Sequence, residues 1–134
     1  MLYKKYASIP ANTTDINPDH RKLIVCKGTI KQWIIFFDPE AADLLHVRVE
    51  YHGSSIMPFS GKDWLVAFFT DTPLDDNIKL NAPPYELDIY AYNEDDSYRH
   101  EYFIHPIIIR NAPVTPAEET AGLWDKMKGF IGVE

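Results

Sequence analysis

The stretch Leu45 to His52, LHVRVEYH, constrains the fold of this chain more than any other. Its apolar and polar side chains alternate, with Leu, Val, Val and Tyr at every second position and His, Arg, Glu and His between them. A period of two is typical of a β-strand with one buried face and one face in water. Because parallel sheets are covered on both faces, a single wet face favours an antiparallel sheet.

Most other apolar runs resemble partners of this strand. They are short, rich in Ile, Val, Phe and Tyr, and bounded by Gly, Pro, Asn and Asp. Seven or eight runs of this kind follow one another at the spacing typical of a sandwich or jelly roll. We therefore predict an all-β protein, an antiparallel, jelly-roll-like β-sandwich of seven or eight strands with a short C-terminal amphipathic helix.

The length of 134 residues suits one domain with one core. We expect residues 1–20 to form an N-terminal arm or a first strand and loop, residues 21–111 the sandwich, and residues 112–134 a linker and the amphipathic helix. A single cysteine, Cys26, cannot form an internal disulfide. No apolar run resembles a signal peptide or a membrane span, so we expect the protein to be cytosolic when synthesised.

A formal net charge of −7 excludes one class of partner. Affinity for phosphate comes from clustered Lys and Arg, which Asp and Glu outnumber here. We therefore expect no nucleic-acid partner.

Both faces of the run Thr29 to Phe37 are apolar. One face carries Trp33, Ile35 and Phe37, and the other carries Ile30, Ile34 and Phe36. Such a strand is either central in its sheet or packs one face against another subunit. We place Trp33, Ile35 and Phe37 among the candidate interface residues.

The C-terminal segment has the pattern of a helix. Thr115 is a candidate N-cap, Pro116 takes the first helical position, and Glu118 completes a capping box. A helical stripe follows, made of Ala117, Thr120, Leu123, Trp124, Met127, Phe130 and Ile131. The stripe could pack on its own sandwich, on a neighbouring subunit, or on a membrane surface, although its acidic polar face argues against anionic lipid. The candidate interface residues here are Leu123, Trp124, Met127, Phe130 and Ile131.

The segment Asn93 to Ser97, NEDDS, is predicted to be a tight hairpin turn between strands at Tyr85 to Tyr92 and Tyr98 to Ile109. Its carboxylates are ligands that Ca²⁺ prefers, but their spacing differs from that of an EF-hand loop. Acidic residues are also ordinary turn formers. We expect no metal or cofactor, and the sequence leaves open whether residues 93–96 bind a cation.

Four tyrosines cluster around this turn: Tyr90, Tyr92, Tyr98 and Tyr102. Tyrosines beside acidic residues can stack on sugar rings, but tyrosine is equally favoured at protein interfaces and along strands. We regard these four residues as candidate ligand-binding residues.

No pattern indicates a catalytic site. The five histidines include no pair at the i, i+4 spacing of zinc proteases. A serine follows closely after His52, but no G-x-S-x-G elbow surrounds it. We expect the protein not to be an enzyme.

Three segments carry a resemblance to a known group of proteins: LHVRVEYHG, MPFSGKDWL and PPYELDIYAYNEDDSYRH. Over Ile9 to Arg110 the chain resembles small β-sandwich proteins of viruses and phages, similar to the single-jelly-roll capsid proteins of tailless double-stranded DNA viruses and to decoration domains. The resemblance assigns no functional residue. It implies a non-enzymatic building block that presents a sandwich face or edge to copies of itself.

Two functions are therefore expected. The first is a structural subunit that self-assembles or decorates a virion or similar particle, with copies of itself and other particle proteins as partners. The alternative is a β-sandwich module that binds a carbohydrate or a receptor, such as a surface glycan. The first places the protein in the virion after synthesis in the host cytoplasm, and otherwise we expect it in the cytoplasm.

Overall fold

The computed structural model describes residues 3–58, 64–67 and 73–110, and these residues form strands and loops without a helix. The all-β prediction is confirmed for this part of the chain. The predicted C-terminal helix lies outside the described residues, together with Leu123, Trp124, Met127, Phe130 and Ile131.

The described residues contain nine strands, against seven or eight predicted. Their bounds are β1 (Lys5–Ile9), β2 (Asp19–Ile24), β3 (Gly28–Phe37), β4 (Leu45–Tyr51), β5 (Ser54–Met57), β6 (Leu65–Val66), β7 (Leu74–Leu80), β8 (Glu86–Asn93) and β9 (His100–Ile109).

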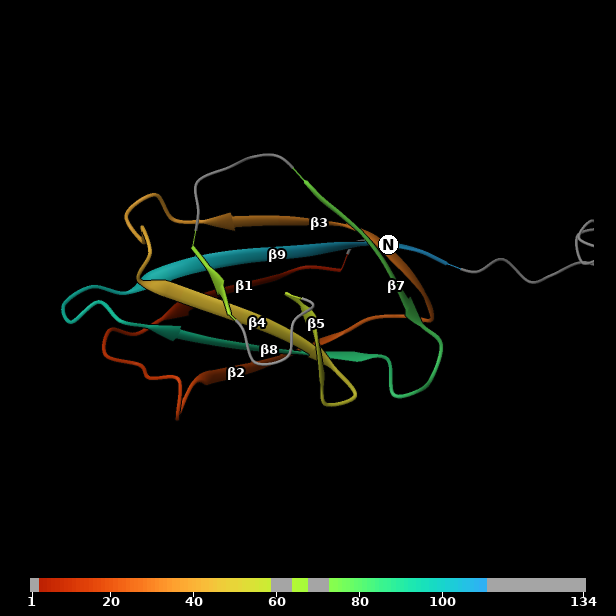
Figure 1. The fold of residues 1–134 in the computed structure, drawn as a ribbon, viewed down its shortest axis with the longest axis horizontal. Coiled ribbons are helices and arrows are strands. Elements are labelled where there is room, and N and C mark those ends of the chain that lie inside the picture. Colours follow the sequence, from red (N-terminus) through yellow and green to blue (C-terminus); the bar gives the residue numbers. More distant parts are fainter. Residues whose placement is uncertain (1–2, 59–63, 68–72, 111–134) are drawn as a thin grey trace, which may run out of the picture.

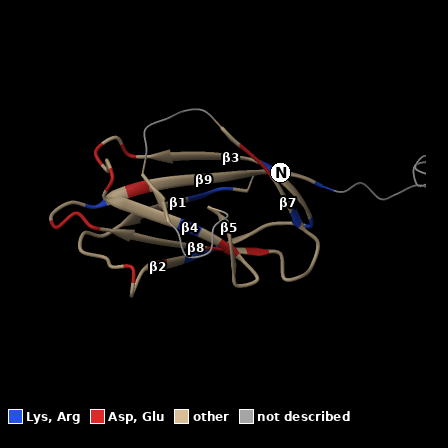
Figure 2. Ribbon diagram, viewed as in Figure 1, with Lys and Arg blue, Asp and Glu red and all other residues tan. Residues whose placement is uncertain are grey.

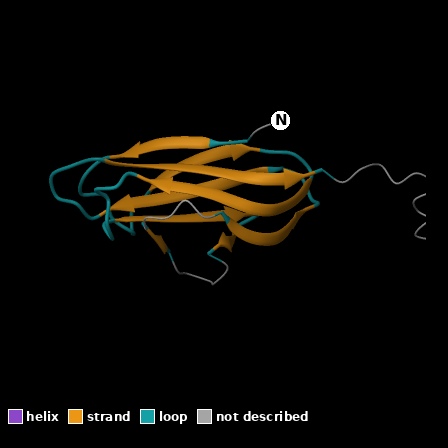
Figure 3. Ribbon diagram, turned by 90° about the horizontal axis from the view of Figure 1, so that it is seen from above, coloured by secondary structure: helices purple, strands orange, loops and turns teal. Residues whose placement is uncertain are grey.

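The strands form two antiparallel sheets (Figure 1). One sheet, called here the β3 sheet, has the order β1-β9-β3-β7. The other, called the β8 sheet, has the order β2-β8-β4-β5, and β6 also pairs with β4. Consecutive strands usually lie in different sheets, so the chain alternates between the two layers. The exception is β4, β5 and β6, which follow one another within the β8 sheet. Figure 3 shows the layered strands with their loops at the two ends.

One hydrophobic core joins the two sheets into a β-sandwich-like fold. In β4 the apolar set Leu45, Val47 and Val49 is fully buried, as the alternation predicts. In β8 the buried positions are Leu87, Ile89 and Ala91. Each fully buried aliphatic side chain of this kind contributes about 1.5–3 kcal/mol, so the alternating strands hold the sheets together.

A bulge in β3 changes which face Ile30 occupies. The pairing register shifts between Ile30 and Gln32, both toward β7 and toward β9. One extra residue reverses the alternation on either side of a bulge. Ile30 is therefore fully buried, and the prediction that it shares a face with exposed Phe36 is wrong.

The predicted hairpin at Asn93 to Ser97 is also wrong. β8 pairs with β2 and β4, whereas β9 pairs with β1 and β3, so this segment crosses from one sheet to the other. Alternating patterns on both sides of a turn are the same for a hairpin and for a crossing between sheets. The true two-residue hairpin turn joins β4 to β5 at His52 and Gly53, whose φ values of 53° and 82° suit a type I′ turn.

Strand β7 starts at Leu74, within the stretch 70–76 that its polar residues predict to be a loop. Its polar side chains bond across to β3: Gln32 Nε2 donates to Asp75 at 3.0 Å, and Lys31 Nζ donates to Asn77 at 2.9 Å. Cross-strand polar pairs stabilise a strand at the edge of a sheet, where polar residues also discourage pairing with other chains.

Candidate functional site

The outer face of the β3 sheet carries a group of apolar and aromatic side chains. It carries Tyr6 of β1, Ile34 and Phe36 of β3, and Phe103, His105 and Ile107 of β9, which we call the apolar outer face. These residues alternate with the buried residues of the same strands, so they point away from the core.

Three aromatic side chains form a row across the middle of this face. Phe103 is paired with Tyr6 on one side and with Phe36 on the other. The Phe36 and Phe103 rings lie 6.0 Å apart, and Tyr6 and Phe36 are 60% and 45% exposed. Large contiguous apolar patches on a protein surface mark contact sites. The row is therefore a candidate protein contact.

His105 lies next to this row and is compatible with an apolar surface, because its imidazole favours the uncharged form. Partial burial, together with the positive charge of Lys4, lowers the pKa of the His105 imidazole. Its ring also meets Phe103 edge to face, with centroids 6.2 Å apart. Near neutral pH the side chain is therefore uncharged and adds to the apolar outer face.

The outer face of the β8 sheet has the opposite character, because its charges are paired. His20 Nε2 lies 2.9 Å from Asp88, and Lys22 Nζ lies 3.3 Å from the same carboxylate. Burial alone would raise the pKa of Asp88, but the hydrogen bonds from His20 and Lys22 outweigh it and lower that pKa. Exposed pairs of this kind contribute little stability, and they keep the face hydrated.

Aromatic rings lie between these charges. His46 stacks parallel on Tyr92 with centroids 4.3 Å apart, and Trp64 meets Tyr92 perpendicularly at 4.8 Å. The Arg48 guanidinium lies over Trp64, 4.4 Å from the ring centroid. His20 stacks on Tyr90 at 4.5 Å. Stacked rings and cation–π contacts of this type hold side chains in fixed positions on a surface.

A buried hydrogen-bond cluster ties the loops together at one end of the sandwich. Asn93 is fully buried, and its Nδ2 donates to the carbonyls of Ile9 and Tyr98, at 3.1 and 3.0 Å. Its Oδ1 accepts from the Asp95 amide at 3.0 Å. This one amide therefore connects the end of β1 to the crossing between β8 and β9.

His100 is held in the same cluster between two carboxylates. Its Nδ1 lies 3.1 Å from an oxygen of Asp38, and its Nε2 lies 2.8 Å from an oxygen of Asp95. Burial alone would lower the pKa of His100, but the hydrogen bonds that the imidazole makes to the carboxylates of Asp95 and Asp38 outweigh it and raise that pKa. Backbone hydrogen bonds from Ser97, followed by the His100 contact, lower the pKa of Asp95.

The hydrogen bonds of this cluster also involve the oxygens that would have to bind a cation at residues 93–96. The oxygens of Asn93 and Asp95 are already bonded to Asp95, Ser97, Tyr98 and His100. Within the described ranges, no group of three or more His, Cys, Asp and Glu is placed to hold a metal ion. Nor does a histidine there hydrogen-bond to a serine, threonine or cysteine side chain, as a nucleophilic site requires.

Some predicted site residues lie elsewhere than expected. Trp33, Ile35 and Phe37 are 1%, 6% and 8% exposed and pack in the core, so their place at an interface is wrong. A central strand of a sandwich can be apolar on both faces, and it is the opposite face, with Ile34 and Phe36, that points outward.

The four candidate ligand-binding tyrosines are not brought together. Tyr90 and Tyr92 share the outer face of the β8 sheet, whereas Tyr98 is 71% exposed in the crossing segment. Tyr102 is 1% exposed in the core and cannot reach a ligand, so its assignment is wrong. The sequence patterns did not point to His46, Arg48 and Trp64 as site residues. His46 and Arg48 are nevertheless polar-face residues of β4, the strand with the clearest alternation.

Removing the hydroxyl of Tyr102 is expected to stabilise the protein. That oxygen is buried and has no hydrogen-bond partner among the described residues, and burial raises the pKa of the phenol. We expect Tyr102→Phe to raise the free energy of unfolding by about 1 kcal/mol, because an unsatisfied buried hydroxyl costs about 1–3 kcal/mol. Urea unfolding of both proteins measures the change, and a loss of more than about 1 kcal/mol would contradict it.

Comparison of the chain with protein family models, with curated proteins and with solved structures finds no match. The described residues include no helix long and apolar enough to cross a membrane. The fold and its surfaces define a β-sandwich-like protein with one apolar outer face and one aromatic, charged outer face.

Proposed function

We propose that the protein is a non-enzymatic structural subunit that assembles with copies of itself in a virion or similar particle. One observation carries this proposal: the aromatic row of Tyr6, Phe103 and Phe36 on the outer face of the β3 sheet. A row of this kind gains stability only when another surface covers it. The charge pairs on the β8 sheet favour contact with water there, so the β3 sheet is the better contact face.

The order of the strands supports the same proposal. With β6 set aside, eight strands divide equally between two sheets, and the chain passes from one sheet to the other at all but one connection. This order supports a jelly roll, a fold that virus capsids and lectins use. We propose the jelly roll as the finer description of this sandwich.

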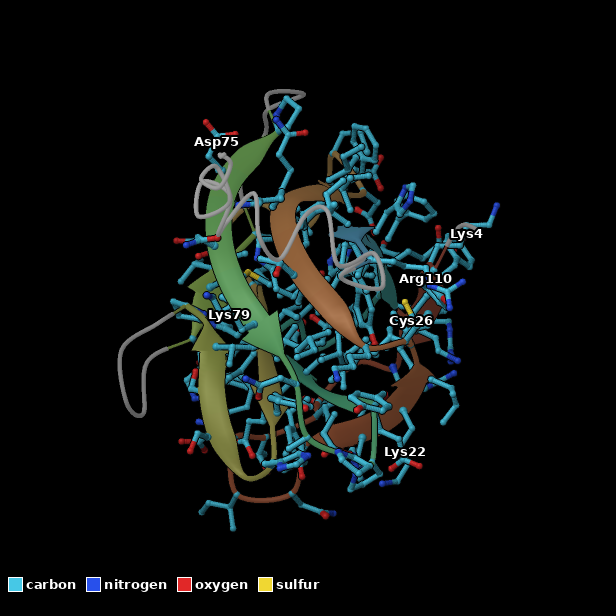
Figure 4. All side chains as sticks on the ribbon, turned by 90° about the vertical axis from the view of Figure 1, so that its right-hand side faces the viewer. Lys4, Lys22, Cys26, Asp75, Lys79 and Arg110 are labelled. Carbon is cyan, nitrogen blue, oxygen red and sulfur yellow. The ribbon has the colours of Figure 1, made fainter. Side chains whose placement is uncertain are left out.

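Residues 111–134 of a second copy are the proposed cover of the apolar outer face. This segment follows Arg110, which lies after β9 in the middle of the β3 sheet and is labelled in Figure 4. A helix over residues 116–131 would be about 24 Å long, which suits the length of the strands it would cross. Its predicted apolar stripe matches the apolar character of the face.

Exchanging such segments would add to the area that each contact buries. A specific interface buries about 800 Å² on each partner. The apolar outer face together with the helical stripe supplies a compact apolar contact of the kind that permanent assemblies use.

The test is the mass of the full-length protein in solution, with electron microscopy of any particles. We expect assemblies for the native chain, and dissociation to monomers for Phe36→Glu and for Trp124→Glu, because each places a charge in the contact. Ile24→Glu is the control: Ile24 is 61% exposed but lies on β2 of the other sheet, so assembly should persist.

Two results would contradict the proposal. The first is a native chain that stays monomeric at high concentration. The second is an assembly that tolerates Phe36→Glu as well as it tolerates Ile24→Glu. A monomer in which Trp124→Glu destabilises the fold would instead show that the segment covers its own sheet.

A further inference from the structure

A hollow lies between the connection from β1 to β2 and the end of β8. Its volume is about 410 Å³, and it is lined by Asn12, Thr13, Thr14, Asp15, Tyr92 and Glu94. Small-molecule sites have volumes of about 300–1,000 Å³. The hollow belongs to the loop end of the sandwich and to the outer face of the β8 sheet, so it is separate from the apolar outer face.

The loop that forms one wall is held in place by the backbone. The Asn12 amide donates to the Asp95 carbonyl at 2.9 Å, and the Thr13 amide donates to the Asn93 carbonyl at 3.1 Å. Asn12 has a φ of 63°, a left-handed conformation that asparagine tolerates better than most residues. Because the wall is already ordered, binding of a ligand would not carry the entropy cost of ordering this loop.

Tyr92 forms the opposite wall with a ring that is held by its neighbours. His46 stacks against it at 4.3 Å, and Trp64 meets it at 4.8 Å. Partial burial, followed by the charges of Glu94 and Asp15, raises the pKa of the Tyr92 hydroxyl. The phenol is therefore protonated near neutral pH and can donate a hydrogen bond at the edge of the hollow.

The polar groups of the hollow are mainly acceptors. The Asp15 carboxylate makes no hydrogen bond or ion pair within the part of the chain that the structure describes. The Glu94 carboxylate lies 3.2 Å from His46 Nε2 and is largely exposed. Acidic residues also gather in the loops at this end of the molecule (Figure 2). The hollow therefore repels anions and suits a ligand rich in donors.

We propose that this hollow binds an uncharged sugar ring of a glycan. Pairs of adjacent hydroxyls on the sugar would donate to the carboxylates of Asp15 and Glu94, and charge-assisted hydrogen bonds of this kind are the stronger ones. The ring of Tyr92 would contact the apolar C–H groups of the sugar. Sialylated and sulfated glycans are excluded by the same carboxylates. The proposal does not depend on assembly of the chain.

The test is titration of the full-length protein with uncharged methyl pyranosides, including glucoside, galactoside, mannoside and N-acetylglucosaminide, followed by amide chemical shifts in NMR spectra. We expect one or more of these sugars to shift the amides of residues 12–15 and 92–94, with sialic acid causing no shift. Saturation transfer to the sugar measures the same binding if the protein assembles into particles too large for amide spectra.

Two matched substitutions make the test specific. Asp15→Asn should weaken binding about fivefold or more, because a neutral acceptor replaces a charged one. Asp75→Asn makes the same chemical change on β7 in the other sheet and should leave the affinity unchanged. Amide spectra of both variants check that the fold is retained.

The proposal is overturned if none of the uncharged sugars shifts these amides or receives saturation transfer. It is overturned equally if Asp15→Asn binds as well as the native protein, or if sialic acid competes with the uncharged sugar. None of these outcomes depends on the mass measurements that test assembly.

Discussion

Replacing Asn93 with alanine is expected to lower the free energy of unfolding by about 3 kcal/mol, because it removes three hydrogen bonds, one of them buried and two part-buried. The lost side chain donates to two carbonyls, those of Ile9 and Tyr98, and accepts from the Asp95 amide. An unsatisfied buried group costs about 1–3 kcal/mol, so the three losses together exceed the effect of most single substitutions.

Urea unfolding of the native and variant proteins measures this difference. Asn77→Ala is the matched control, because Asn77 is exposed on β7 and its side chain accepts one hydrogen bond within the described ranges, from Lys31 Nζ across the strand pair. We expect a change of about 0.5 kcal/mol or less for this variant. A loss below about 1 kcal/mol for Asn93→Ala would show that the cluster does not hold the loop end together.

His100→Gln is expected to destabilise the protein by an amount that depends on pH. A protonated imidazole donates to both Asp38 and Asp95, whereas a neutral imidazole has one N–H and can donate to only one of them. Glutamine keeps one donor and cannot take the extra proton. We expect a loss of about 3 kcal/mol near pH 6 that narrows to about 1 kcal/mol near pH 9.

The sign follows from the pKa of His100, which is higher in the folded protein than its ordinary value. The stabilisation is complete below the unfolded pKa of about 6.5, and it is lost as the pH rises through the folded pKa. Asp95 acts in the opposite direction, because its pKa is lowered on folding. Its contribution is present above about pH 4 and is lost as the pH falls through its folded pKa.

Urea unfolding at a series of pH values measures this effect in native and His100→Gln proteins. His20→Gln is the control, because His20 is an exposed residue paired with Asp88 at the surface. Its effect should be small across the same range. If the difference in free energy of unfolding between the native protein and His100→Gln does not change with pH, the charge of His100 does not hold the loops together.

Part of the candidate site could be predicted from the sequence, but the face of the sheet on which each residue lies could not. Tyr92 was selected because aromatic and acidic residues cluster near it, and it does line a hollow beside Glu94 and Asp15. Tyr102 was selected by the same clustering, yet it is buried. Clustering along the chain does not say which face of a strand a residue occupies once a crossing between sheets intervenes.

The position of the apolar outer face could not be predicted from the sequence either. The sequence places Ile34 and Phe36 opposite Trp33, but it does not say which of the two apolar faces meets the other sheet. That choice is made by packing against the other sheet, because Trp33 shares one core with Leu45 and Leu87, which come from distant parts of the chain.

The sequence by itself determined that the chain is built of antiparallel strands, because the alternation of side chains in β4 and β8 is a local property of the backbone. Only the tertiary structure decided which strands are neighbours, where the chain crosses between sheets, and which groups meet at the loop end. The reason is that β-pairing joins residues far apart in the sequence, so His100 and Asp38 come together only when β9 pairs with β3.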